Sequence, residues 1–165
     1  GFLRNDTANT YEAIGIDATF FDDQGFRHGP LKARLPFLLL GPGEQCPFSV
    51  ELAARNVESF LLHPNGRETK RESAAVTLSN LNMTYSGTDS VRITGRASNP
   101  NEFMIKNVAV AAVLKDAGEQ IVSLGWTFVL QENIGPNASV TFDLRIERVP
   151  FYRYQLYAQA ERDWE

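Results

Sequence analysis

Two histidines and one cysteine are the side chains of this sequence best suited to chemistry. Nucleophilic catalysis needs a histidine that an acid positions beside a serine or cysteine nucleophile. His28 precedes Gly29-Pro30, which predicts an exposed loop, and His63 immediately precedes Pro64. Neither histidine lies in a nucleophile motif, so the sequence predicts no catalytic residue and a protein that is not an enzyme.

The sequence also contains few residues that could bind a metal ion or a cofactor. Cys46 is the only cysteine, which excludes an internal disulfide framework and a multi-thiolate metal site. It follows a Gly-Pro-Gly turn, and we expect it to be a small buried hydrophobe. Asp22 and Asp23, followed by Gly25, provide too few oxygen ligands for calcium and predict a turn instead. We therefore expect no metal and no cofactor.

Composition narrows the function classes further. Of the 165 residues, 43% are hydrophobic and 22% are charged, which is typical of a folded globular chain. The net charge of −4 offers no basic face to a nucleic acid. The longest apolar run, residues 35–40, is far shorter than a membrane-spanning helix, which needs about 20 residues. We expect no transmembrane helix in this chain, and membrane association only through partners or through a missing N-terminal anchor.

A repeat at a spacing of 94 residues organises the elements that position these side chains. Residues of the same or similar type recur at this spacing: Gly1 with Gly95, Asn5 with Asn99, Asp22 with Asp116, Phe48 with Phe142, and Phe60 with Tyr154. The alternating apolar run at 14–20 recurs at 108–114. Because alternate side chains line one face of a strand, both runs are predicted strands with one buried face.

Turn residues separate the predicted strands. Residues 22–25 and 116–118 each begin with an aspartate and end with a glycine, the chemistry of a hairpin turn. Residues 56–62 suit either one helical turn or a strand. In the second copy strands are expected near 75–85, 90–98, 106–115, 120–131, 139–147 and 152–160. Many short alternating strands predict an all-β fold, in the form of two tandem immunoglobulin-like antiparallel β-sandwiches.

The boundary between the two copies is expected in a polar stretch near the middle of the chain. Residues 64–73 lack apolar periodicity and contain Pro64 and the pair Asn65-Gly66. We therefore expect a first sandwich over 1–66, a linker over 67–73 and a second sandwich over 74–165.

The first copy is expected to be incomplete at its start. About twenty residues, 75–94, precede Gly95 in the second copy, whereas the first copy begins at the equivalent Gly1. The first sandwich would then lack its N-terminal strand and expose an unpaired edge. Either upstream residues belong to a longer protein, of which this chain without an initial Met is a processed product or a part, or another protein chain donates the strand. Phe2 and Leu3 at this edge are candidate partner-binding residues.

Aromatic residues crowd the C-terminal end of the chain. Tyr152 and Tyr154 share one face of a predicted strand, whereas Trp164 lies beyond that strand. An exposed terminal tryptophan can anchor an interface, so Trp164 is a further candidate partner-binding residue. The other interpretation is a tryptophan that folds back over its own domain.

Two segments resemble the motif that names the FxLYD domain family. They are Ala-Thr-Phe-Phe-Asp at 18–22 and Ala-Val-Leu-Lys-Asp at 112–116, and the resemblance extends over most of the chain as two copies. Both depart from the motif, because Ala18 and Ala112 replace phenylalanine and Lys115 stands where tyrosine is expected. The resemblance implies non-enzymatic modules of secreted or cell-envelope proteins, in the prokaryotic periplasm or on the cell surface.

Together these observations predict a non-catalytic structural or interaction module of the cell envelope or extracellular space. We expect a subunit of a larger, membrane-associated assembly that contacts partners through strand edges and its aromatic C-terminus. The alternative is a ligand- or carbohydrate-binding accessory module of a larger secreted enzyme or adhesin. Two or three coplanar exposed aromatics beside polar loops would indicate the sugar-binding alternative.

Overall fold

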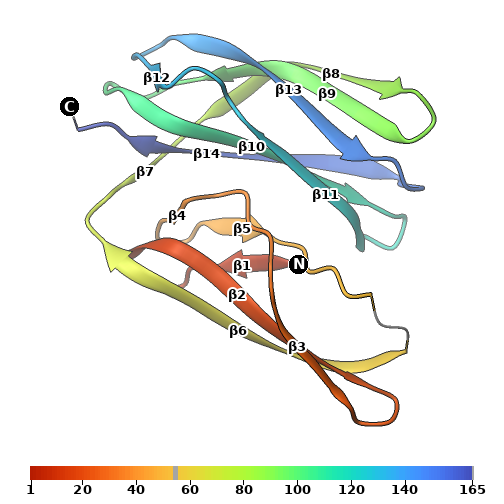
Figure 1. Ribbon diagram of the computed structural model, residues 1–165. Helices are drawn as coiled ribbons and strands as arrows, with labels where there is room; N and C mark the ends of the chain where they lie inside the picture. Colours follow the sequence, from red (N-terminus) through yellow and green to blue (C-terminus); the bar gives the residue numbers. More distant parts are fainter. Residues whose placement is uncertain (54–55, 165) are drawn as a thin grey trace. The chain divides into compact units, whose positions relative to one another are not determined.

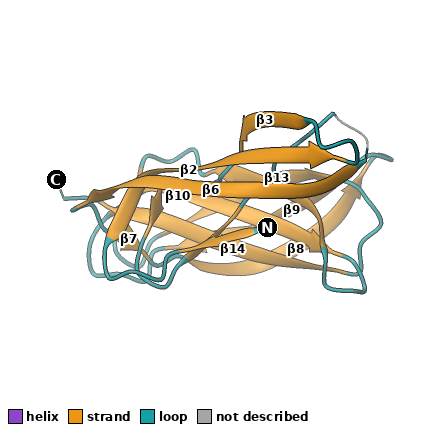
Figure 2. Ribbon diagram, turned by 90° about the horizontal axis from the view of Figure 1, so that it is seen from below, coloured by secondary structure: helices purple, strands orange, loops and turns teal. Residues whose placement is uncertain are grey.

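The computed structural model describes residues 1–53 and 56–164, and its regular elements in these ranges are all β-strands (Figures 1 and 2). Every strand pair is antiparallel, so the prediction of an all-β antiparallel fold is confirmed. Within the described ranges no helix exists that could cross a membrane. The chain divides into two compact units, Gly1–Lys70 and Arg71–Glu165.

The first unit is built around one long antiparallel pair of strands, the second and the sixth in chain order. Its strands are β1 (Phe2–Arg4), β2 (Thr10–Asp22), β3 (Arg27–Lys32), β4 (Leu39–Leu40), β5 (Gln45–Pro47) and β6 (Val57–Thr69). One sheet has the order β3-β2-β4, with β6 also paired to β2, and β1 pairs with β5 in a second, two-stranded sheet. On β2 the burial follows the predicted alternation only in part: Ile16 and Ala18 are buried, but so is Thr19 on the other face.

The second unit contains two larger sheets. Its strands are β7 (Ser73–Ala74), β8 (Thr77–Ser86), β9 (Ser90–Ser98), β10 (Ile105–Lys115), β11 (Ile121–Phe128), β12 (Asn133–Ile134), β13 (Ser139–Glu147) and β14 (Arg153–Arg162). One sheet has the order β11-β10-β14-β7, with β12 also paired to β10, and the other has the order β13-β9-β8. The core includes Ile93 of β9, Val110 of β10 and Leu144 of β13, all fully buried.

Strand pairing in the two units follows the same register at the 94-residue spacing. These Cα partners recur: Leu3–Cys46 as Ala97–Val140, Tyr11–Leu40 as Ile105–Ile134, Glu12–Arg67 as Lys106–Glu161, and Ala18–Leu62 as Ala112–Leu156. The β2–β6 register shifts between Glu12 and Gly15, and the β10–β14 register shifts at the equivalent place. Among the described residues of the first unit, no strand corresponds to β7 or β8.

The structure differs from the sequence prediction around the expected linker. β6 continues to Thr69, so residues 67–69 of the predicted linker 67–73 lie in a strand, and β7 already begins at Ser73. The cause is cross-strand pairing: residues 64, 65 and 67–69 pair with β2, with Gly66 at a register shift, and this tertiary contact outweighs the turn-forming composition of Pro64 to Gly66. The same pairing settles the ambiguity at residues 56–62, because β6 begins at Val57 as a strand.

Candidate interaction surface

A buried asparagine fixes the end of β1 in the first unit. The Nδ2 of Asn5 donates hydrogen bonds to the carbonyl oxygens of Asn9 (2.7 Å) and Leu40 (2.9 Å), and the residue is 5% exposed. Asn99 after β9 makes the equivalent bonds to Phe103 (2.8 Å) and Ile134 (2.9 Å). β1 is therefore held in the position that the end of β9 occupies in the second unit.

The two edges of β1 have different environments. On one side β1 pairs with β5, and the flanking backbone bonds continue this ladder: Phe48 N–H to Gly1 O (2.9 Å) and Asn5 N–H to Glu44 O (3.0 Å). Since backbone groups alternate in direction along a strand, those of Arg4 face the opposite edge. There β9 pairs with β8, Ser98 opposite Thr77, but among the described residues β1 has β5 as its one partner strand.

Apolar side chains lie exposed on the face that this missing strand would cover. Leu62 is the Cα partner of Ala18, and Phe60 is the Cα partner of Phe20, with ring centroids 6.3 Å apart. Leu62 is 37% exposed and Phe60 is 59% exposed. In the second unit the equivalent Tyr154 and Leu156 pack against the core together with side chains that β8 and the residues before it supply: Val76, Leu78 and Met83.

A glycine and an aromatic ring meet beside this face in both units. A Cβ on Gly1 would lie 2.9 Å from the ring of Phe48, and a Cβ on Gly95 would lie 2.8 Å from the ring of Phe142. In the second unit Leu81 of β8 also lies 2.8 Å from that Cβ position, and Phe142 is buried. Phe48 is half-buried. The first unit thus has the glycine and the ring, and no residue in the position of Leu81 among those the structure describes.

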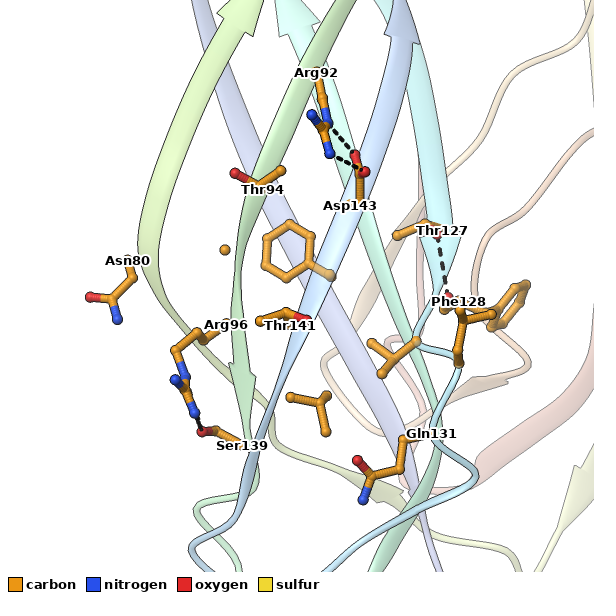
Figure 3. Close-up of a pocket in the computed structure, with 15 residues that line it drawn as sticks. Asn80, Arg92, Thr94, Arg96, Thr127, Phe128, Gln131, Ser139, Thr141 and Asp143 are labelled. Atoms are coloured by element: carbon orange, nitrogen blue, oxygen red, sulfur yellow. Dashed lines mark hydrogen bonds and ion pairs between the residues drawn. The ribbon is translucent and has the colours of Figure 1, made fainter.

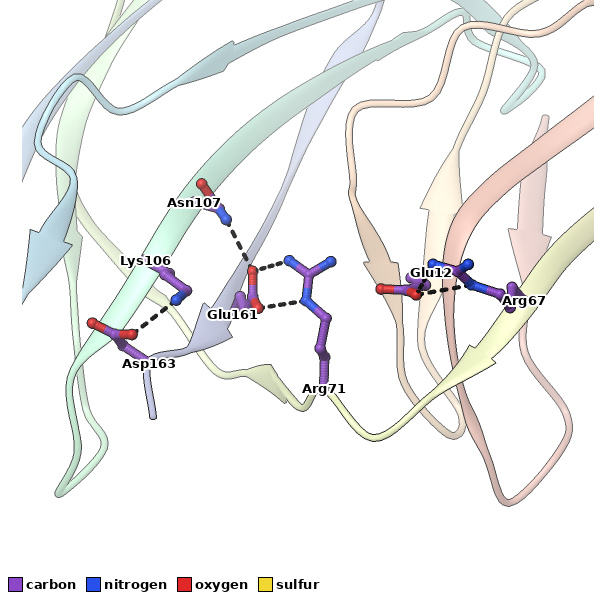
Figure 4. Close-up of polar contacts among 7 residues, drawn as sticks. All are labelled: Glu12, Arg67, Arg71, Lys106, Asn107, Glu161 and Asp163. Atoms are coloured by element: carbon purple, nitrogen blue, oxygen red, sulfur yellow. Dashed lines mark hydrogen bonds and ion pairs between the residues drawn. The ribbon is translucent and has the colours of Figure 1, made fainter. Parts of the chain in front are cut away.

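Two ion pairs join the segment before β8 to β14 in the second unit. Arg71 donates to Glu161, with Nε 2.6 Å from Oε1 (Figure 4), and Arg162 Nη1 lies 3.0 Å from Glu72 Oε2. Burial raises the pKa of Glu161, but hydrogen bonds from Arg71 and Asn107, with the charges of Arg71 and Lys106, hold it below its usual value. In the first unit Arg67 occupies the position of Glu161, and Glu68 occupies the position of Arg162. Arg67 pairs with Glu12 (Figure 4).

The structure places the candidate partner-binding residues in two different units. Phe2 and Leu3 lie on β1, half-buried, and belong to the first unit. Trp164 belongs to the second unit, where the guanidinium of Arg162 lies 3.8 Å from the centre of its ring and 4.4 Å from the ring of Phe103. Trp164 therefore packs on its own unit, although more than half of the side chain remains exposed.

The candidate chemical residues lie on three different strands of the first unit. His28 lies in β3 and not in the expected loop, with Nε2 3.0 Å from Asp22 Oδ2, and this hydrogen bond lowers the pKa of Asp22. His63 lies on β6 opposite Asp17. Cys46 is buried, and this burial raises the pKa of its thiol to about 12. Within residues 1–53 and 56–164 no three His, Cys, Asp or Glu side chains form a group that could hold a metal ion.

Asp22 acts as a turn residue. Its Oδ1 accepts the backbone N–H groups of Gln24 (3.0 Å) and Phe26 (2.8 Å). Asp116 accepts the N–H groups of Gly118 and Gln120 in the same way, at 2.9 Å each. One carboxylate oxygen of each aspartate is therefore engaged in closing a hairpin, and the two hairpins are equivalent.

A hollow of about 910 Å³ lies on the second unit (Figure 3). Its charged lining residues are already paired: Arg92 with Asp143, at 2.9 and 2.7 Å, and Arg96 with Ser139, at 3.1 Å. Of its two aromatic lining residues, Phe128 is exposed and Phe142 is buried. The lining therefore offers no row of coplanar exposed aromatics of the kind that stacks on a sugar.

Comparisons of the chain with family models, with curated proteins and with solved structures find no match. Function is therefore inferred from the geometry of the chain itself.

Proposed function

We propose that this chain is a non-catalytic interaction protein made of two immunoglobulin-like modules of FxLYD type. The shared strand register at a spacing of 94 residues supports the duplication. The first module engages another polypeptide at the edge of β1, and the chain serves as a subunit of a larger, membrane-associated assembly of the cell envelope. Trp164 at the end of the second module provides a further contact.

One observation carries this proposal. The face of the first module that includes Phe60 and Leu62 is exposed, whereas β8 covers the equivalent face of the second module. Fully burying one such side chain contributes about 1.5–3 kcal/mol, so an added strand gains from the apolar face as well as from its backbone ladder. An open edge beside an exposed apolar face is the arrangement that β-strand addition uses.

Photo-crosslinking in the cell that makes the protein tests the proposal. p-Benzoylphenylalanine in place of Phe2 should crosslink to a second polypeptide, and mass spectrometry should map the adduct to an extended segment of it. The same probe in place of Tyr152, which is exposed on the second unit, serves as the control and should give no such adduct. Adducts that are absent at Phe2, or equal at both positions, would refute strand addition at β1.

An edge variant sharpens the result. Arg4→Pro removes a backbone N–H on the open side of β1, while the bonds to β5 on the other side remain. Arg4→Ala is the matched control, since it loses the Arg4–Asp6 ion pair but keeps the N–H. The crosslink from Phe2 should be lost in Arg4→Pro and kept in Arg4→Ala.

A further inference from the structure

We propose that the strand accepted by the first unit begins with an acidic residue followed by a basic residue, and continues with apolar side chains at alternate positions. This rests on the proposed function and names the chemistry of its partner. As in the proposed function, the strand is assigned to a second polypeptide, and the charge order described below disfavours a copy of this chain in that role.

The second unit shows how such a segment is seated. β7 pairs with the end of β14, with Ser73 opposite Glu161 and Ala74 opposite Ala160. The two residues before β7 form the ion pairs, Arg71 with Glu161 and Glu72 with Arg162. The incoming segment thus has a basic residue, Arg71, followed by an acidic one. On β14 the acidic Glu161 comes first and a basic residue follows it.

The first unit presents the opposite order of charge. Arg67 occupies the position of Glu161, and Glu68 occupies the position of Arg162, as the shared register of β6 and β14 shows. The charge on the paired strand is reversed as well. The Cα partner of Arg67 is the acidic Glu12, whereas the Cα partner of Glu161 is a lysine, Lys106 (Figure 4). The side chain of Arg67 is 77% exposed, so it can pair with an incoming carboxylate while Glu12 stays beside it.

This charge order disfavours the corresponding segment of a second copy. Arg71 of another copy would lie against Arg67, and its Glu72 would lie against Glu68, which gives two like-charge contacts. Like charges at an interface disfavour the wrong partner, so the first unit selects against exchange of β7 and β8 between copies. An acid-then-base segment makes two attractive contacts at the same positions.

The apolar part of the partner follows from the exposed face. In the second unit Val76 and Leu78 follow the charged residues and pack on the side that includes Tyr154 and Leu156. The equivalent face of the first unit presents Phe60 and Leu62. An incoming strand with two apolar side chains at the spacing of Val76 and Leu78 would cover them.

Two synthetic peptides test the inference on the full chain. One has the sequence of residues 71–86, and the other has the same sequence with R71E and E72R. Amide NMR signals of β1 and β6 report binding to the first unit. The charge-reversed peptide should bind about tenfold more tightly, and its advantage should shrink at high salt. Equal affinities of the two peptides, or binding by neither, would overturn the inference.

A chain variant provides the reciprocal test. Glu12→Lys with Arg67→Glu and Glu68→Arg gives the first unit the charges of Lys106, Glu161 and Arg162, and the peptide with native charges should now bind more tightly. An unchanged preference overturns the charge rule. If a peptide binds to the first unit only when it is fused to the chain ahead of Gly1, the assignment of the strand to a separate polypeptide is overturned. If no peptide binds while the Phe2 crosslink persists, this inference fails and the proposed function stands.

Discussion

The ring of Phe142 lies against Gly95, with ring atom Cε1 2.8 Å from the position that a Cβ on Gly95 would take. Only glycine allows this approach of β13 side chains to β9, because any larger residue must displace the ring. Phe48 makes the same contact with Gly1, at 2.9 Å. The two units therefore use one packing solution at equivalent places, and they differ in the strand that completes it.

Substitution of Gly95 should destabilise the second unit. In Gly95→Ala the new methyl group would overlap the rigid ring of Phe142, and overpacking of this kind costs about 1–3 kcal/mol. Urea unfolding followed by tryptophan fluorescence measures the loss. Gly135→Ala is the matched control, because no atom lies within 4 Å of its Cβ position. Equal unfolding midpoints for the two variants would contradict the packing account.

The side-chain N–H groups of Asn99 should be required for the stability of the second unit. Asn99→Asp keeps the shape but removes the two bonds to the carbonyls of Phe103 and Ile134, and leaves a carboxylate facing them. Unsatisfied buried groups cost about 1–3 kcal/mol each, so a loss of at least about 2 kcal/mol is expected in chemical unfolding. Asn133→Asp, at an exposed position on β12, should change stability little. A similar small effect at Asn99 would show that its bonds are not needed.

Cys46 should be unreactive in the folded chain and should make stability depend on pH at alkaline values. Its pKa is about 12 when folded and 9.0 in the reference state, so below pH 9 the thiol is protonated in both states. As pH rises from 9 towards 12 the unfolded chain releases this proton first, and stability falls by up to about 1.4 kcal/mol per pH unit.

Cys46→Val isolates this contribution, because valine occupies the equivalent position 140 and cannot ionise. Its stability should fall less than that of the wild type between neutral pH and about pH 10, measured by urea unfolding. Iodoacetamide should modify the wild-type thiol in urea and not in buffer. Rapid alkylation of the folded chain would disprove burial of this thiol.

Glu161 should contribute to stability at neutral pH and lose this contribution in acid. Its folded pKa lies below the reference value of 4.5, so the contribution is present above 4.5 and disappears as pH falls through the folded value. Glu161→Gln should therefore be less stable than the wild type at pH 7, with a flatter stability curve in acid. Wild-type and variant curves that run parallel across this range would contradict the ion-pair account.

The apolar alternation at 14–20 and 108–114 predicts the positions of β2 and β10. The prediction of one buried face is wrong for β10, because all of residues 108–114 are buried, on both faces of the strand. The sequence mislocates the end of β6, since Pro64 to Gly66 resemble a turn until the pairing of Pro64 and Asn65 with β2 is known.

The candidate site could be predicted only in part. Comparison of the two halves of the sequence predicts that the first copy lacks its opening strand. This comparison also indicates Phe2 and Leu3 as residues at the exposed edge. The exchange of Arg67 and Glu68 for Glu161 and Arg162 is visible in the sequence at the same spacing. Its meaning depends on the register of β7 against β14, which only the structure supplies. The stacking of Arg162 between Phe103 and Trp164 joins residues far apart in the sequence and leaves no such mark.

Hydrogen exchange at three backbone amides of the isolated full chain tests the open edge of β1 most directly. The amide of Leu3, which faces β5, and the amide of Ser98, which faces β8, should both be protected. The amide of Arg4, at the position equivalent to Ser98, should exchange at least about 100-fold faster than that of Ser98. Protection of Arg4 equal to that of Ser98, with no second polypeptide present, would show that the edge is closed and would contradict the account.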